Sequence, residues 1–210
     1  MVVDERLRLI LVTDGQGDLG RIEHVVRRAW SGGCRCVQLR EPGWSAAELV
    51  SACARLRALT AGEGGVLLVN DRVDVAAAGY ADGAQVGHRS LPPAEARAVL
   101  GAGRWLGYSA HDAEQLEQAR GASCDFALLS PVWRTTSKPG VDPLGVARAG
   151  QLTERAGLPV IWLGGVTAAA CGQLAGLGAG ARPYGVAVMS ALMRAGDPEL
   201  ATREILSALR

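Results

Sequence analysis

Short apolar runs alternate with amphipathic segments along the whole chain. Residues 9–13 form a run of strand-forming side chains, and apolar residues between 22 and 30 recur at the three- and four-residue spacing of a helix. Gly32 and Gly33 end that segment, and a second apolar run follows at 36–40. The pattern predicts a strand, a helix and a second strand. It continues with predicted strands at 66–69, 84–86, 105–108, 126–129, 159–163 and 184–188, and with helices at 46–60, from 73 onward, at 93–100, 113–120, 144–155 and 168–177, and ending near 209.

This alternation favours one fold class. Strands that alternate with helices pair in parallel through right-handed crossovers, and the chain holds eight such strand–helix pairs. We therefore expect an α/β protein, with a single (β/α)8 TIM barrel domain spanning residues 1–210. The alternative is an open, doubly wound sheet. Against it, no G-x-G-x-x-G turn follows the first strand, and the even spacing gives no sign of a switch point.

The composition favours one core and a small-molecule partner. Of the 210 residues, 49% are hydrophobic, and the formal charges nearly cancel to +1. No block of like charges occurs, so the sequence indicates no nucleic-acid partner, and a small polar substrate is expected. The sequence leaves open whether the chain forms a homo-oligomer.

The cysteines and the N-terminus predict the compartment. The 5 cysteines form an odd set without a C-x-x-C pair, so we expect reduced thiols that pack in the core. Residues 1–6 lack the apolar core of a signal peptide, and no apolar run approaches the roughly 18 residues of a membrane span. The expected location is the cytoplasm, without membrane contact.

Polar side chains stand where the predicted strands end, which is where barrels of this type carry their active sites. Gln38 and Arg40 end the second strand, and period-two alternation turns both inward. An inward-facing arginine needs an anionic partner or ligand. Asn70 and Asp71 end the third strand and offer an amide and a carboxylate, although both residue types also cap helices.

The fifth predicted strand ends in Ser109 and His111, which share a face in an extended strand. Histidine titrates near neutrality, so a histidine at a barrel mouth is a candidate for proton transfer. Lone histidines are often structural, and the residue pattern leaves both roles open.

The loop after the sixth strand, from Ser130 to Gly140, is longer than most connections and carries hydroxyls and two cations. Its Thr135, Ser137 and Lys138 are typical of an anion-binding loop, although any exposed loop uses such residues. Gly164-Gly165 and Met189-Ser190 follow the seventh and eighth strands, just before helices. Backbone N–H groups at this position hold phosphate in many barrels.

Six segments of the chain resemble the thiamine phosphate synthase/TenI family in order and spacing, and the resemblance covers nearly the whole sequence. It implies an enzyme of thiamine biosynthesis that acts on a thiazole phosphate. The segments are Gln38–Glu41, Asn70–Asp74, Gly107–His111, Ser130–Lys138, Gly164–Thr167 and Val186–Ser190.

Two positions depart from the synthase pattern. By resemblance, the synthase joins a pyrimidine diphosphate to thiazole phosphate and releases pyrophosphate, using Mg²⁺ and cations. This chain has Pro42 where the pyrophosphate-binding lysine belongs, and Ser90 where a metal-binding aspartate belongs. Because Mg²⁺ prefers carboxylate oxygens, Asp71 alone is a weakened site. The departures favour the TenI branch, whose members are thiazole tautomerases.

A tautomerase moves a proton on a carboxythiazole phosphate to give the aromatic isomer, and the resemblance implies no cofactor and no metal. It implies His111 as the general acid/base. The alternatives are a synthase that binds Mg²⁺ at Asp71, and a non-catalytic regulatory homologue that binds thiazole phosphate. The implied substrate-binding residues are Gln38, Arg40, Asn70, Asp71, Ser109, Thr135, Ser137 and Lys138, and the implied phosphate-binding residues are Gly164, Gly165, Met189 and Ser190.

Overall fold

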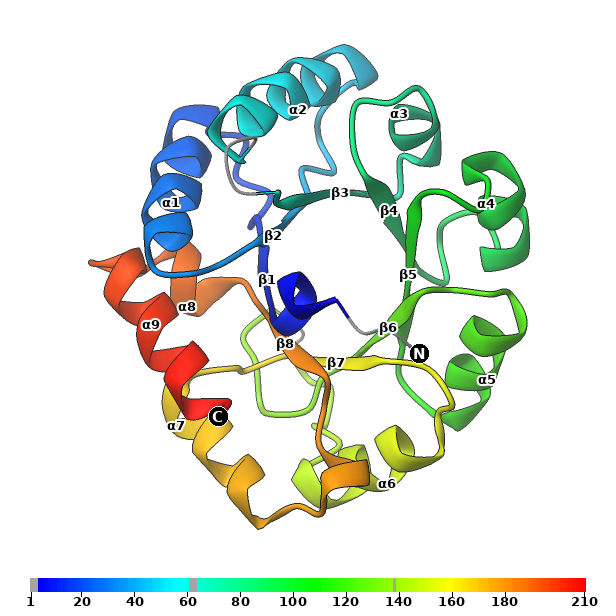
Figure 1. The fold of residues 1–210 in the computed structure, drawn as a ribbon, viewed down its shortest axis with the longest axis vertical. Helices are drawn as coiled ribbons and strands as arrows, with labels where there is room; N and C mark the ends of the chain where they lie inside the picture. The colour runs from blue at the N-terminus through cyan, green and yellow to red at the C-terminus, as the bar shows by residue number, and fades with distance from the viewer. Residues whose placement is uncertain (1–3, 61–63, 138) are drawn as a thin grey trace.

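The strands of the computed structural model, which describes residues 4–60, 64–137 and 139–210, form a closed ring. Neighbours in the chain pair in parallel, and β8 returns to pair with β1 (Figure 1). The predicted (β/α)8 barrel is confirmed, and the open sheet is excluded. The strands are β1 (Leu9–Val12), β2 (Cys36–Leu39), β3 (Val66–Asn70), β4 (Gly83–Val86), β5 (Trp105–Ala110), β6 (Phe126–Leu129), β7 (Val160–Leu163) and β8 (Gly185–Val188).

The helices form a ring around the strands (Figure 1). The short 3-10 segments are η1 (Glu5–Arg8), η3 (Gln173–Gly176) and η4 (Ala179–Ala181). The α-helices are α1 (Leu19–Ser31), α2 (Ala46–Thr60), α3 (Val73–Ala77), α4 (Pro93–Leu100), α5 (Ala113–Gly121), α6 (Val146–Arg155), α7 (Ala168–Gly172), α8 (Ser190–Met193) and α9 (Pro198–Ala208).

Two apolar layers hold the barrel together, because successive side chains of a strand point to opposite faces. One layer fills the barrel interior and includes Ile10, Phe126 and Ile161, each fully buried. The other lies between the strands and the helices and includes Val37 and Leu39. The same alternation directs residue 38 inward, as the sequence predicts.

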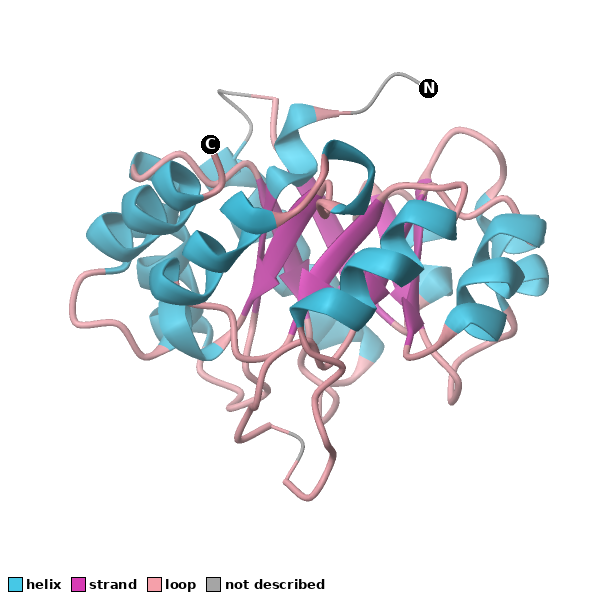
Figure 2. Cartoon of the chain, turned by 90° about the horizontal axis from the view of Figure 1, so that it is seen from below, coloured by secondary structure: helices cyan, strands magenta, loops and turns pink. Residues whose placement is uncertain are grey.

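The long loops gather at the C-terminal ends of the strands, where the β6–α6 loop projects furthest (Figure 2). The opposite end is covered by η1, whose Leu7 is 1% exposed and joins the interior layer. Since one end is closed by packed side chains, any binding site of the barrel lies at the loop-bearing end.

Three predicted helices differ from those observed. The helix predicted from 144 begins at Val146, because the N–H groups of Leu144 and Gly145 donate to the β6–α6 loop carbonyls at 131 and 132. The helix predicted at 168–177 divides into α7 and η3. The terminal helix divides into α8 and α9, because Asp197 caps a new helix that has proline at its first position.

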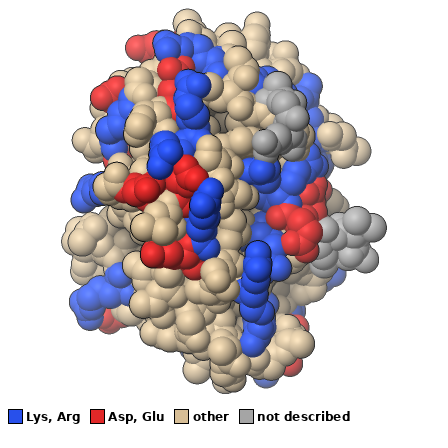
Figure 3. Space-filling view, turned by 60° about the vertical axis from the view of Figure 1, so that its left-hand side comes forward, with Lys and Arg blue, Asp and Glu red and all other residues tan. Residues whose placement is uncertain are grey.

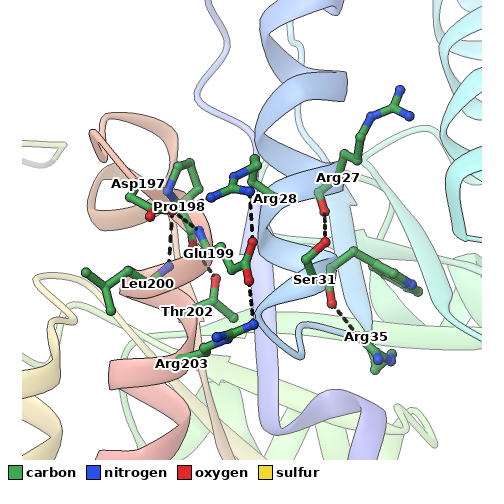
Figure 4. A network of polar contacts seen from close by, with 11 residues as sticks. Arg27, Arg28, Ser31, Arg35, Asp197, Pro198, Glu199, Leu200, Thr202 and Arg203 are labelled. Carbon is green, nitrogen blue, oxygen red and sulfur yellow. Dashed lines mark hydrogen bonds and ion pairs between the residues drawn. The ribbon is translucent and has the colours of Figure 1, made fainter.

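Helix α9 packs on α1 and thereby covers the seam where β8 meets β1 (Figure 4). Arg28 of α1 lies 3.0 Å from the Asp197 carboxylate and 2.9 Å from that of Glu199. Thr202 is fully buried beside Gly32, where a Cβ would stand 2.6 Å from the Glu199 carbonyl oxygen. Exposed ion pairs stabilise little, so the close backbone approach at Gly32 dominates this contact.

Substituting Gly32 with alanine is expected to lower the free energy of unfolding by about 1–3 kcal/mol, because the added methyl group forces the two helices apart. Urea unfolding followed by circular dichroism measures the change. Gly172→Ala is the matched control, since a Cβ there meets nothing within 4 Å. Equal stability of the Gly32→Ala variant and the wild type would show that α1 and α9 are not tightly packed.

Basic and acidic side chains are interleaved on the side of the molecule that carries α1 (Figure 3). Arg55 of α2 pairs with Glu23 of α1 at 2.5 Å, which is one such contact. Among the described residues of this side, charges of both signs therefore lie next to one another. Within residues 4–60, 64–137 and 139–210, no helix is long and apolar enough to cross a membrane.

The cysteines are buried and free, as their apolar surroundings predict. Burial raises the pKa of Cys34 to about 11. Burial also raises the pKa of Cys36 well above its ordinary value. Both thiols therefore stay protonated at neutral pH and serve as small core residues.

Candidate active site

A cavity of about 380 Å³ opens among the loops at the C-terminal ends of the strands. Its floor is apolar and includes Val12, Leu163 and Ala187 at the ends of β1, β7 and β8. An apolar floor under polar walls suits a small heterocycle that carries an anionic group. The polar and glycine wall residues are Asp14, Arg40, Ser130, Thr135, Thr136, Ser137, Gly164, Ser190 and Arg194.

The cavity brings together residues from three segments that were predicted to bind the substrate or its phosphate. Thr135 and Ser137 of the β6–α6 loop line it together with Gly164, Met189 and Ser190. Segments far apart in the sequence therefore meet around one cavity. Lys138, which was expected in the same loop, lies outside the described residues.

The two glycines after β7 make room for the β6–α6 loop. Their φ angles are 96° at Gly164 and 67° at Gly165, a region that favours glycine. A Cβ would stand 2.8 Å from the Pro131 Cα at the first and 2.4 Å from the Arg134 carbonyl oxygen at the second. Gly165 thus packs beneath the loop, outside the cavity lining.

Arg40 and Asp14 bring opposite charges to the cavity wall. The Arg40 backbone N–H donates to the Thr13 hydroxyl at 2.8 Å, and among the described residues its guanidinium forms no ion pair. Asp14 is already neutralised by Arg21 of α1, 2.5 Å away, and its side chain is 4% exposed. The charge of Arg40 is therefore available to a ligand, as expected for an inward-facing arginine.

Glu41 is a residue whose role the sequence reasoning missed. It is 4% exposed, and its carboxylate accepts hydrogen bonds from the N–H groups of Gly15 at 3.2 Å and Gly17 at 2.8 Å. These contacts fix the β1–α1 loop against the β2–α2 loop, which keeps Arg40 and Asp14 on the same wall. Its place directly after the Gln38–Arg40 pair was the available signal.

A chain of hydrogen bonds crosses the barrel mouth from β2 to the loop after β4. Gln38 donates to the Asn70 side-chain oxygen at 2.9 Å, and Asn70 donates to the Asp71 carboxylate at 2.8 Å. The Ser90 hydroxyl donates to the other oxygen of Asp71 and accepts from the Gly87 N–H at 2.8 Å. Asp71 has φ 61°, a conformation that Asp tolerates better than most residues.

The direction of this chain is fixed by Asp71, because a carboxylate only accepts hydrogen bonds. Asn70 must therefore turn its amide nitrogen toward Asp71 and its oxygen toward Gln38. Gln38 in turn points its nitrogen at Asn70, which leaves its own Oε1 buried and, among the described residues, without a donor. Gln38 does not line the cavity, and its unpaired acceptor is the kind of group that an N–H donor of a ligand satisfies.

His111 stands beside the cavity rather than in its lining. Its ring Nδ1 lies 2.5 Å from the carbonyl oxygen of Ser130, a cavity residue. Because a carbonyl only accepts, Nδ1 carries the proton and Nε2 holds the lone pair of the neutral ring. Ser109 does not line the cavity either, and its hydroxyl accepts a hydrogen bond from Gln85 Nε2 at 3.0 Å. The structure thus brings His111 next to the site and engages Ser109 in the wall of the barrel.

The fold is a (β/α)8 barrel, and its cavity lies at the C-terminal strand ends, where enzymes of this fold carry their active sites. The thiamine monophosphate synthase family matches residues 9–192, and the chain belongs to this family. The predicted family resemblance is confirmed, and with it a place in thiamine biosynthesis.

Relatives along the whole chain carry the name of the synthase. The thiamine-phosphate synthase of Laribacter hongkongensis is 36% identical over 97% of this chain and 95% of its own. That of Vibrio campbellii is 34% identical over 97% of this chain and 98% of its own. The solved structure of thiamine phosphate pyrophosphorylase from Pyrococcus furiosus superposes with a TM-score of 0.84 at 26% identity, covering 98% of this chain and 96% of that one.

These comparisons do not specifically support the tautomerase that the sequence led us to expect. The names of the relatives fit a transferase, the synthase alternative, better than an isomerase. The signal that favoured the tautomerase was the pair of departures at Pro42 and Ser90. Ser90 belongs to the hydrogen-bond chain described above, and Pro42 directly follows Glu41.

Proposed function

We propose that the chain is a thiamine-phosphate synthase, which joins a pyrimidine diphosphate to thiazole phosphate and releases pyrophosphate. The observation that carries the proposal is the buried Oε1 of Gln38, which is 3% exposed and lacks a donor among the described residues. An aminopyrimidine brings N–H groups that satisfy this acceptor, whereas a carboxythiazole phosphate has none. The relatives named above support the same assignment.

The cavity supports binding of the second substrate. Ser190 and the Gly164 backbone face the hollow from the ends of β8 and β7, and Thr135 and Ser137 add hydroxyl groups. Such groups hold a phosphate by neutral hydrogen bonds. Arg40 lies across the cavity, where a cation stabilises negative charge that develops on a departing diphosphate.

The residues near Asp71 fit a Mg²⁺ ion that arrives with the diphosphate. Mg²⁺ sites commonly use one or two carboxylates together with substrate phosphates. Within the described part of the chain, no group of three His, Cys, Asp or Glu is arranged to hold a metal. Asp71 would therefore be the protein's charged ligand, with the Ser90 hydroxyl beside it. The ion would neutralise the diphosphate, while Asn70 and Ser90 orient the carboxylate.

A second candidate function is the thiazole tautomerase, and the specific observation in its favour is the loss of charged groups on the diphosphate side. Pro42 brings no cation to the leaving group, and Ser90 brings no carboxylate to the Mg²⁺ ion that would neutralise it, so both departures weaken diphosphate binding. The lone pair on His111 Nε2 suits proton transfer beside the cavity.

One assay separates the two candidates. The purified protein is incubated with pyrimidine diphosphate, thiazole phosphate and Mg²⁺, and thiamine phosphate is measured by chromatography together with released pyrophosphate. We expect stoichiometric formation of both products, which stops when Mg²⁺ is chelated. Absence of product, combined with accelerated isomerisation of carboxythiazole phosphate in a parallel reaction, would replace the synthase assignment by the tautomerase.

A further inference from the structure

We infer that Arg194 is a substrate-binding residue that contacts the phosphate of the thiazole substrate from the end of α8. The inference rests on one part of the proposed function, which is that the cavity binds a phosphate monoester. It adds a cation at a position that the motifs of the sequence do not include, and it selects for substrates that carry a dianionic phosphate.

The geometry of α8 directs Arg194 to the same side as Ser190. The Arg194 N–H donates to the Ser190 carbonyl oxygen at 3.1 Å, which is an i, i+4 helical contact. Residues four apart lie on one face of a helix, and both of these residues line the cavity. Arg194 thus lies one helical turn after Ser190, whose hydroxyl is proposed to bind the phosphate.

The backbone that carries Arg194 is held in place by α1. Arg21 donates to the Met193 carbonyl oxygen at 2.9 Å and pairs with Asp14 at 2.5 Å. This single arginine therefore ties the end of α8 to the β1–α1 loop. A fixed Cα lowers the conformational cost of aiming a long side chain at a ligand.

The charges of the cavity are unbalanced without a ligand. Arg40 and Arg194 both line it, and among the described residues neither forms an ion pair. Asp14, the acidic residue of the wall, is already neutralised by Arg21. Two uncompensated guanidinium groups around one hollow suit phosphorylated ligands, because the planar fork of arginine matches phosphate oxygens in pairs.

The position of Arg194 assigns it to the monophosphate rather than to the diphosphate. It shares the Ser190 side of the cavity, whereas Arg40 and Asp71 directly follow β2 and β3. The chain lacks the lysine of the synthase pattern at Pro42, so Arg194 also restores one positive charge to the mouth of the barrel. In this assignment Arg194 binds the monophosphate of the thiazole, and Arg40 binds the diphosphate of the pyrimidine.

The test compares phosphate binding by the wild type and by Arg194→Gln. Isothermal titration with inorganic phosphate is expected to show a dissociation constant raised about tenfold or more, because a charge-assisted pair is lost. Arg194→Lys should fall between the two. Arg27→Gln removes the same charge from an exposed site on α1, outside the cavity, and should bind phosphate like the wild type (Figure 4).

A second measurement distinguishes this inference from the proposed function. In the condensation assay, Arg194→Gln should raise KM for thiazole phosphate and leave KM for the unphosphorylated thiazole alcohol unchanged. Phosphate dissociation constants within twofold of the wild type would overturn the inference even if condensation occurs. Weakened phosphate binding in a protein that makes no thiamine phosphate would support the inference and reject the synthase.

Discussion

Replacing Arg40 with glutamine is expected to lower kcat/KM for condensation by about 10²–10³-fold, the usual loss when one donor to a developing oxyanion is removed. The guanidinium lines the cavity without an ion pair among the described residues, so a departing diphosphate is its natural partner. Glutamine keeps a hydrogen-bond donor on a shorter side chain and removes the charge. Steady-state kinetics with varied pyrimidine diphosphate measures the effect.

The structure supplies a matched control for Arg40→Gln. Arg148 is exposed on α6 and lines a separate hollow on the outside of the barrel between α5 and α6. Arg148→Gln makes the same change in net charge and should retain wild-type kinetics. If both variants turn over equally fast, the leaving group does not depend on Arg40, and the proposed placement of the diphosphate is wrong.

The second large effect is expected at His111. Asparagine at this position keeps an N–H donor for the Ser130 carbonyl oxygen but cannot accept a proton on the side of Nε2. Any isomerisation of carboxythiazole phosphate should therefore fall about 10²–10⁴-fold, the typical contribution of a positioned acid or base. Condensation needs no such base in our assignment and should fall by less than about tenfold.

Comparing the rates of isomerisation and condensation shows which role His111 plays. Both activities are measured on the same His111→Asn preparation, and KM for thiazole phosphate is followed as a check on the binding site. Equal losses in the two reactions would mean that His111 acts by positioning the Ser130 loop. A selective loss of isomerisation would show that the tautomerase chemistry is real and runs through the imidazole.

The spacing of the apolar residues predicted the fold because the strands and the surrounding helices of a barrel each require a different spacing of apolar side chains. Strands such as residues 9–13 and 36–40 were located within one residue of β1 and β2. Helix ends were harder to predict where tertiary contacts decide them. The start of α6 depends on loop carbonyls more than ten residues earlier in the chain, and such a contact leaves no local pattern.

The site was predictable where the chemistry sits directly after a strand. Arg40, Gly164 and Ser190 were named from their positions and line one cavity, whereas His111 lies beside it. Arg194 was missed because only residues directly after each strand were considered. It lies after α8, one helical turn beyond the end of β8.

The sequence favoured the tautomerase over the synthase for a different reason. Two missing charged residues, at Pro42 and Ser90, outweighed the rest of the pattern in the sequence reasoning. The free acceptor on Gln38 is visible only when Asp71, Asn70 and Gln38 are seen to be linked in that order. Hydrogen-bond direction is a property of the folded network, so the sequence could not supply it.

The packing of α9 on α1 bears on how the protein is made. Gly32 is synthesised long before Thr202. Most of the chain has therefore emerged from the ribosome before these two residues can come into contact. Until then the part of α1 that packs on α9 is exposed. Nascent chains at that stage are candidates for chaperone binding. Packing at this seam is therefore a late event that waits for α9 to leave the exit tunnel.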